Sequence, residues 1–195
     1  MDIIGKRFSP VEFAVYAKAI IPPAKWKGEF IVLHNTSEPT LAERPHGFLP
    51  EHMVNLADYY SGLGWSHGPH LFVDDNGIWV FSPLSAPGIH SPSWNAISYG
   101  VEQLGEFDTE AYETGRGLAV QKNAIAAMAV IGHFAGIDSH SMRLHKEDPN
   151  TTHRDCPGVN CASHKAAIMD AVHAYMVAHL SPPVATPLRL TNKPV

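Results

Sequence analysis

The sequence has little cysteine, no excess of basic charge and no long hydrophobic run. Its two cysteines, Cys156 and Cys161, are too few for a disulfide framework. Fourteen Lys and Arg stand against nineteen Asp and Glu, a formal charge of −5, so we expect no nucleic-acid partner. The longest nearly apolar stretch, residues 124–131, is far shorter than the roughly 18 to 20 residues of a membrane helix. We therefore expect no membrane insertion.

The first residues also lack the pattern of an export signal. Asp2 comes before any basic residue, and no basic-then-apolar segment follows, which predicts synthesis in the cytoplasm without a signal peptide. A chain of 195 residues suffices for one substantial core. We predict a single domain over residues 1–180. Residues 181–195 contain four prolines and no apolar period, which predicts an extended or disordered tail.

Local patterns predict helices interleaved with strands. Ser9-Pro10-Val11-Glu12 has the cap, first-turn proline and capping-box glutamate of a helix start, and Asn76-Gly77 is typical of a hairpin turn. Together the patterns predict α/β or mixed α+β architecture, with a central, mostly buried mixed sheet flanked by about three helices. Helices are expected at residues 10–21, 50–63, 109–135 and 161–179, and strands at 29–34, 69–73, 78–81 and 97–102.

Histidine is abundant, with thirteen residues, and it coincides with the densest polar segment, residues 144–158. Zinc favours imidazole nitrogen and thiolate sulfur, and a catalytic zinc site has three protein ligands and an open fourth position. His145, Cys156 and a distant third ligand would suffice. His34 ends a predicted strand just before a long loop, where a ligand can face a cleft. The residues alone leave open a loop with a buried cysteine and surface histidines.

Four motifs carry a resemblance to a known family. They are residues 32–36 around His34, residues 70–77, residues 95–102 ending in Gly100-Val101-Glu102, and His145 followed by Cys156-Pro157-Gly158. In this order they resemble the zinc-dependent N-acetylmuramoyl-L-alanine amidases, a fold shared by endolysin-like type 2 amidases and the peptidoglycan recognition proteins. The resemblance covers about residues 30–179 and implies that fold for this chain.

The resemblance also implies a set of site residues. His34, His145 and Cys156 match the ligands of one zinc ion per chain, and Glu102 matches the base that activates water. Strand alternation places Glu102 on the face opposite Val101, in agreement with a carboxylate facing a cleft. Arg154, two residues before Cys156, is expected to stabilise developing negative charge.

The matching substrate cleft would be lined by four further side chains: His70, His90, Trp94 and Asn95. Several relatives have a tyrosine directly before the position of His70, and its hydroxyl acts near the zinc. This chain has Pro69 there, so no phenol can act from that position and more of the catalysis is expected from Glu102.

The implied activity is hydrolysis of the amide between N-acetylmuramic acid and L-alanine, with peptidoglycan as partner, in a lysin-like enzyme that acts on the cell wall. Two alternatives stay open: a peptidoglycan-binding module without catalysis, and a bacterial wall-recycling amidase. Binding modules of this fold typically lose the metal cysteine, whereas Cys156 is present. A purely structural zinc would need a fourth ligand, for which His153 is the candidate. The sequence gives no oligomeric state.

Overall fold

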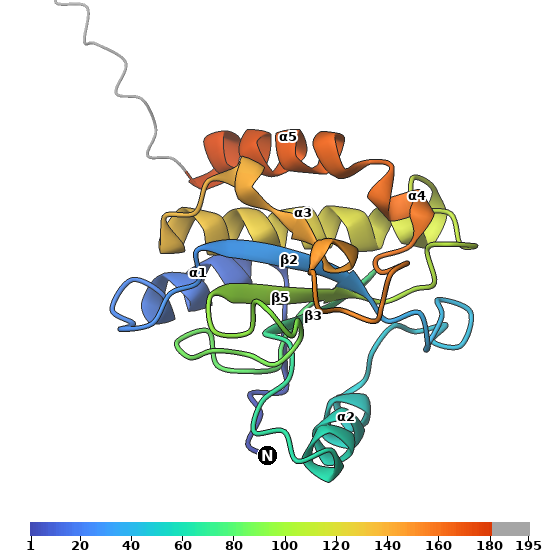
Figure 1. Ribbon diagram of the computed structural model, residues 1–195. Coiled ribbons are helices and arrows are strands. Elements are labelled where there is room, and N and C mark those ends of the chain that lie inside the picture. Colours follow the sequence, from blue (N-terminus) through green and yellow to red (C-terminus); the bar gives the residue numbers. More distant parts are fainter. Residues whose placement is uncertain (181–195) are drawn as a thin grey trace, which may run out of the picture.

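The computed structural model describes residues 1–180, and a six-stranded mixed sheet forms its centre (Figure 1). β3, β5, β2 and β6 run parallel to one another, and β4 runs antiparallel to both of its neighbours, β3 and the edge strand β1. This mixed sheet confirms the predicted fold class. The predicted tail, residues 181–195, lies outside the described residues. In sheet order, the strands are β1 (Lys6–Phe8), β4 (Gly77–Val80), β3 (Leu71–Asp74), β5 (Ser98–Gln103), β2 (Phe30–Asn35) and β6 (Arg143–Leu144).

Helices cover one face of the sheet. The long helix α3 packs against the strands, and α1 and α5 pack against α3. Figure 1 shows α3 and α5 on one side of the sheet and α2 on the other. The helices are α1 (Pro10–Ile20), α2 (Pro50–Gly62), α3 (Gly115–Ala135), α4 (Val159–Ala162) and α5 (Lys165–Tyr175), with short turns η1 (Ser139–Ser141), η2 (His145–Glu147) and η3 (Met176–Leu180).

Two predicted helix boundaries are wrong. The long helix begins at Gly115 rather than at residue 109, because the Glu106 carboxylate accepts the Thr109 N–H at 3.0 Å and holds a separate turn. The last predicted helix is broken between α4 and α5. There the His164 ring lies 2.7 Å from the Asn160 carbonyl oxygen and competes for the acceptor that a continuing helix would use.

Among the helices of residues 1–180, only α3 has the length and hydropathy of a membrane span, and 50% of its most apolar window is buried inside the fold. A core helix can have the same length and hydropathy as a membrane span, and burial of this kind is typical of a core helix. The expected lack of membrane insertion stays a prediction.

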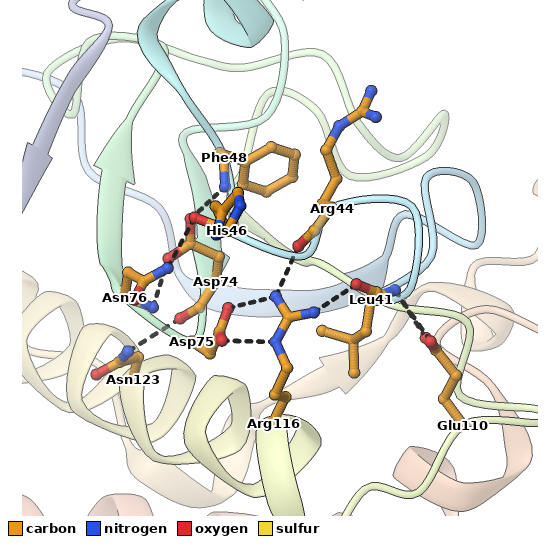
Figure 2. A network of polar contacts seen from close by, with 10 residues as sticks. All are labelled: Leu41, Arg44, His46, Phe48, Asp74, Asp75, Asn76, Glu110, Arg116 and Asn123. Atoms are coloured by element: carbon orange, nitrogen blue, oxygen red, sulfur yellow. Dashed lines mark hydrogen bonds and ion pairs between the residues drawn. The ribbon is translucent and has the colours of Figure 1, made fainter.

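A polar network fastens the long loop after β2 to the end of the sheet (Figure 2). The guanidinium of Arg116, on α3, donates to both carboxylate oxygens of Asp75 and to the carbonyls of Leu41 and Arg44. Four donated hydrogen bonds from one side chain hold the loop between α3 and the β3–β4 hairpin.

Asp74 is the buried centre of the same network. Its carboxylate accepts the N–H of Phe48 at 2.6 Å, the N–H of Asn76 at 2.7 Å and the indole N–H of Trp79 at 3.2 Å. These three donors come from the loop, the hairpin turn and β4. The carboxylate therefore couples the loop at Phe48 to the β3–β4 hairpin, and it also braces the hairpin itself.

We predict that Asp74→Ala lowers the free energy of unfolding by about 3 kcal/mol or more, because it orphans buried donors that each cost about 1–3 kcal/mol when unpaired. Urea unfolding measures the change. Asp58→Ala, the same substitution on the exposed surface of α2, is the matched control. Equal unfolding free energies for the two variants would show that the network does not stabilise the fold.

Candidate metal centre and cleft

The register of three parallel strands places the chemically active residues in one row. His34 of β2 stands opposite Glu102 of β5, and Leu33 stands opposite Leu144 of β6. His145 follows Leu144 directly, so it lies beside His34, with ring centroids 4.3 Å apart. Because side chains alternate along a strand, the leucines face the core while Glu102, His34 and His145 line a cleft on the other face.

Cys156 reaches the same point from the loop before α4. The Lys146 N–H donates to the Cys156 carbonyl at 2.9 Å, and the Asn35 N–H lies 3.5 Å from the Cys156 sulfur. Gly158 has a φ of +88°, and a Cβ there would lie 2.4 Å from the carbonyl carbon of Phe107. Only glycine lets the loop pass so close, which explains the Gly158 of the sequence motif.

The three expected ligands are brought together. His34, His145 and Cys156 each offer one ligand atom, and these atoms all lie within 4.8 Å of one another. The alternative candidate, His153, is outside this group and stacks on His145 with ring centroids 5.3 Å apart. Cys161 is also outside the group, where its buried sulfur accepts a hydrogen bond from Gln103.

The pKa shifts of these residues favour the binding of a cation. Burial lowers the pKa of His34 well below its usual value and that of His145 to about 4, so both rings are neutral, the form that binds metals. Burial raises the pKa of Glu102 to about 8 and, with Glu102 nearby, that of Cys156 well above its usual value. In the described part of the chain, no Lys or Arg offsets either shift. Two neutral imidazoles and a thiol beside a carboxyl group match the donors that a divalent, borderline-soft metal prefers.

The cleft above this group has a volume of about 570 Å³. One wall, at the end of α2, is aromatic and apolar. Tyr60 and Trp65 stack there with ring centroids 5.0 Å apart, while Tyr59 and Leu63 expose 62% and 50% of their surface. The sequence interpretation missed this wall. The cluster of aromatic residues around the helix end is the signal that could have found it.

Of the four side chains expected to line the cleft, the structure places only His90 in its wall. His70 is fully buried between the Ala86 carbonyl and the Gly100 N–H, each 3.0 Å from one ring nitrogen. With both ring nitrogens engaged by the backbone, His70 holds protein segments in place and has no polar atom left to bind a substrate. The other two serve similarly: Trp94 packs edge-on against Phe30, and Asn95 accepts the N–H groups of His90 and Ser91 at 2.7 Å.

Arg154 lies at the cleft edge, exposed to solvent. Its guanidinium donates to the carbonyls of Asp148 and Pro149 at 3.2 Å each, so its own loop holds the positive charge over the cleft. The Asp148 carboxylate in turn accepts the hydroxyls of Ser91 and Ser93. This carboxylate joins the Cys156 loop to the loop that carries His90.

Comparison with known proteins agrees with this geometry. A family model described as N-acetylmuramoyl-L-alanine amidase matches residues 25–159. A comparison with curated proteins finds no match. Among solved structures, the endolysin amidase LysCS from Clostridium intestinale is 23% identical with a TM-score of 0.56, over 74% of this chain and 85% of that chain. PGRP-LB of Drosophila is 17% identical with a TM-score of 0.58, over 84% and 88%. A mutant endolysin from Bacillus subtilis is 19% identical with a TM-score of 0.56, over 78% and 90%. At these identities the structures show a shared fold.

We predict that His145→Ala loses most bound zinc whereas His153→Ala retains it, because only His145 has a ring nitrogen within the group of three ligand atoms. Elemental analysis of zinc-loaded, dialysed proteins gives the metal content. The two variants are matched, since both remove an imidazole from the same loop. The reverse pattern would assign the metal to His153.

Proposed function

The chain belongs to the N-acetylmuramoyl-L-alanine amidase family, and we propose that it cleaves its substrate with one zinc ion held by His34, His145 and Cys156. The family sets the reaction, which is hydrolysis of the amide between N-acetylmuramic acid and L-alanine in peptidoglycan. The observation that carries the proposal is the row of Glu102 on β5, His34 on β2 and His145 directly after β6, completed by Cys156.

The ligand set suits zinc because two neutral imidazoles and one thiol leave a fourth position open, as in catalytic rather than structural sites. When bound, the metal supplies a Lewis acid that polarises the scissile carbonyl and makes water a nucleophile near neutral pH. The chain's own residues then have to orient the substrate and move the protons.

Glu102 is the proposed base. It stands next to His34 in the sheet and lines the cleft. A cation held by the neighbouring ligands would favour its ionised form, and the carboxylate could then take the proton of the attacking water and pass it to the leaving L-alanine nitrogen. Pro69 also lines the cleft but offers no hydroxyl for this task. More of the proton transfer is therefore assigned to Glu102.

Arg154 is the proposed stabiliser of negative charge that develops on the carbonyl oxygen. Its guanidinium is permanently charged and cannot donate a proton in catalysis, so its contribution is electrostatic. The hydrogen bonds to its own loop hold it at the cleft before substrate arrives. Such preorganisation favours the transition state without a later cost of reorganisation.

The complete set of donors, together with Glu102 in the same cleft, favours an enzyme over a binding module without catalysis. Two of the structural neighbours are endolysins by name, which favours a lysin-like enzyme that acts on the cell wall over a wall-recycling amidase.

We predict that Glu102→Gln keeps zinc but lowers the turnover of purified peptidoglycan by roughly a hundredfold to ten-thousandfold, because glutamine keeps the shape and loses the proton acceptor. Zinc content, thermal stability and the release of L-alanine amino termini are compared with those of the wild type. Glu29→Gln, at an exposed position before β2, is the control. Near-normal hydrolysis by a zinc-loaded Glu102→Gln protein would place the base elsewhere.

A further inference from the structure

His90 is a buried histidine, 8% exposed, whose two ring nitrogens both have partners. Its Nε2 lies 3.3 Å from the carbonyl oxygen of Ser98, and its Nδ1 lies 3.1 Å from Nε2 of His34. With both nitrogens engaged, the ring has no polar atom left to bind a substrate. Its contact with a metal-ligand candidate points to a different role from the one expected of a cleft residue.

The partners of His90 determine where the protons lie. A carbonyl oxygen can only accept, so Nε2 of His90 must carry a hydrogen. In a neutral imidazole the other nitrogen is then an acceptor, and Nδ1 of His90 takes the hydrogen on Nε2 of His34. Consequently Nδ1 of His34 keeps a free lone pair, and within residues 1–180 it has no hydrogen-bond partner.

His145 shows the same arrangement at the neighbouring ligand. Its Nε2 lies 2.8 Å from the hydroxyl oxygen of Thr151, and within the described residues its Nδ1 has no hydrogen-bond partner. Both ligand histidines are therefore held through Nε2, which leaves Nδ1 as the nitrogen available at the centre of the group.

We infer that His90 is a positioning residue that fixes the tautomer and the orientation of His34, so that His34 presents Nδ1 to the metal. The inference rests on the proposed function, because it assumes that His34 binds a metal. Partners that hold the second nitrogen of a ligand histidine set its orientation and raise its basicity, and their loss typically weakens metal binding. His90 lines the cleft, but its polar atoms thereby serve the metal site and not the substrate.

Close packing and hydrogen bonds hold the His90 ring and its loop in place. A Cβ at Gly100 would lie 2.4 Å from Cγ of the His90 ring, so the ring fits against β5 only because residue 100 is glycine. The N–H groups of His90 and Ser91 both donate to Asn95, and the Ser91 hydroxyl donates to Asp148 at 2.6 Å. A rigid loop is what a positioning role requires.

His70 provides a matched control, because it is also buried and has the same pattern of hydrogen bonds. Its Nε2 lies 3.0 Å from the Ala86 carbonyl oxygen, and its Nδ1 accepts the Gly100 N–H at 3.0 Å. The difference is that Nδ1 of His70 accepts from a backbone amide, whereas Nδ1 of His90 accepts from His34. The His70 ring also packs edge-on against the His90 ring, with centroids 5.9 Å apart. A substitution that keeps an aromatic ring at position 70 is therefore expected to affect stability without affecting metal affinity.

The test measures the zinc affinity of the full chain by competition with a chelator, and thermal unfolding of each variant in parallel. His90→Phe, which keeps a ring and removes the acceptor, is expected to weaken zinc binding about 10- to 100-fold. His90→Asn places an acceptor oxygen near the position of Nδ1 and is expected to recover most of the loss. His70→Phe is expected to keep the affinity of the wild type.

Nitrogen-15 spectra of the histidine rings provide a second readout on the unsubstituted protein, which matters if His90→Phe does not fold. We expect the His34 proton on Nε2 both without metal and with zinc bound. A proton on Nδ1 of His34, or a folded His90→Phe protein with unchanged zinc affinity, would overturn the role of His90. A wild-type protein without zinc affinity would instead refute the metal site itself.

Discussion

The register between β5, β2 and β6 is the constraint on which the site depends. Successive side chains of a strand face opposite sides of the sheet, so a shift by one residue would turn His34 and Glu102 into the core. Leu33, Val101 and Leu144 are buried to 2% exposure or less, and their burial is worth about 1.5–3 kcal/mol each. The hydrophobic core therefore fixes the register, and the register in turn positions the chemistry on the opposite face.

Two loops bring further site residues to those that the strand register positions. Asp148 binds Ser91 and Ser93, so the loop with His90 and the loop with Cys156 are held together by one buried carboxylate. One loop brings the thiol of Cys156 to His34 and His145, and the other brings the imidazole of His90 to His34. These contacts between protein groups hold the loops that carry the site residues, and preorganisation of this kind is what catalysis exploits.

Much of the fold could be predicted from local patterns, and the remainder depends on tertiary contacts. The capping box of Ser9 and Glu12 and the Asn76-Gly77 hairpin lie where the sequence places them, because both are set by residues a few positions apart. β6 has two residues and no periodic signal, so the neighbourhood of His145 and His34 followed only from family resemblance. The assignments of His70 and His90 required knowledge of the backbone carbonyls that occupy their ring nitrogens, which no sequence pattern encodes.

The central claim is that His34, His145 and Cys156 hold a zinc ion that serves amide hydrolysis. Mass spectrometry of purified peptidoglycan digested by the zinc-loaded chain, and by the same protein after chelation, tests it most directly. The account predicts stem peptides with free L-alanine amino termini and glycan strands without peptides, produced by the loaded protein, lost on chelation and restored by zinc. Intact muropeptides from a zinc-loaded, folded protein, or the same products after complete chelation, would contradict it.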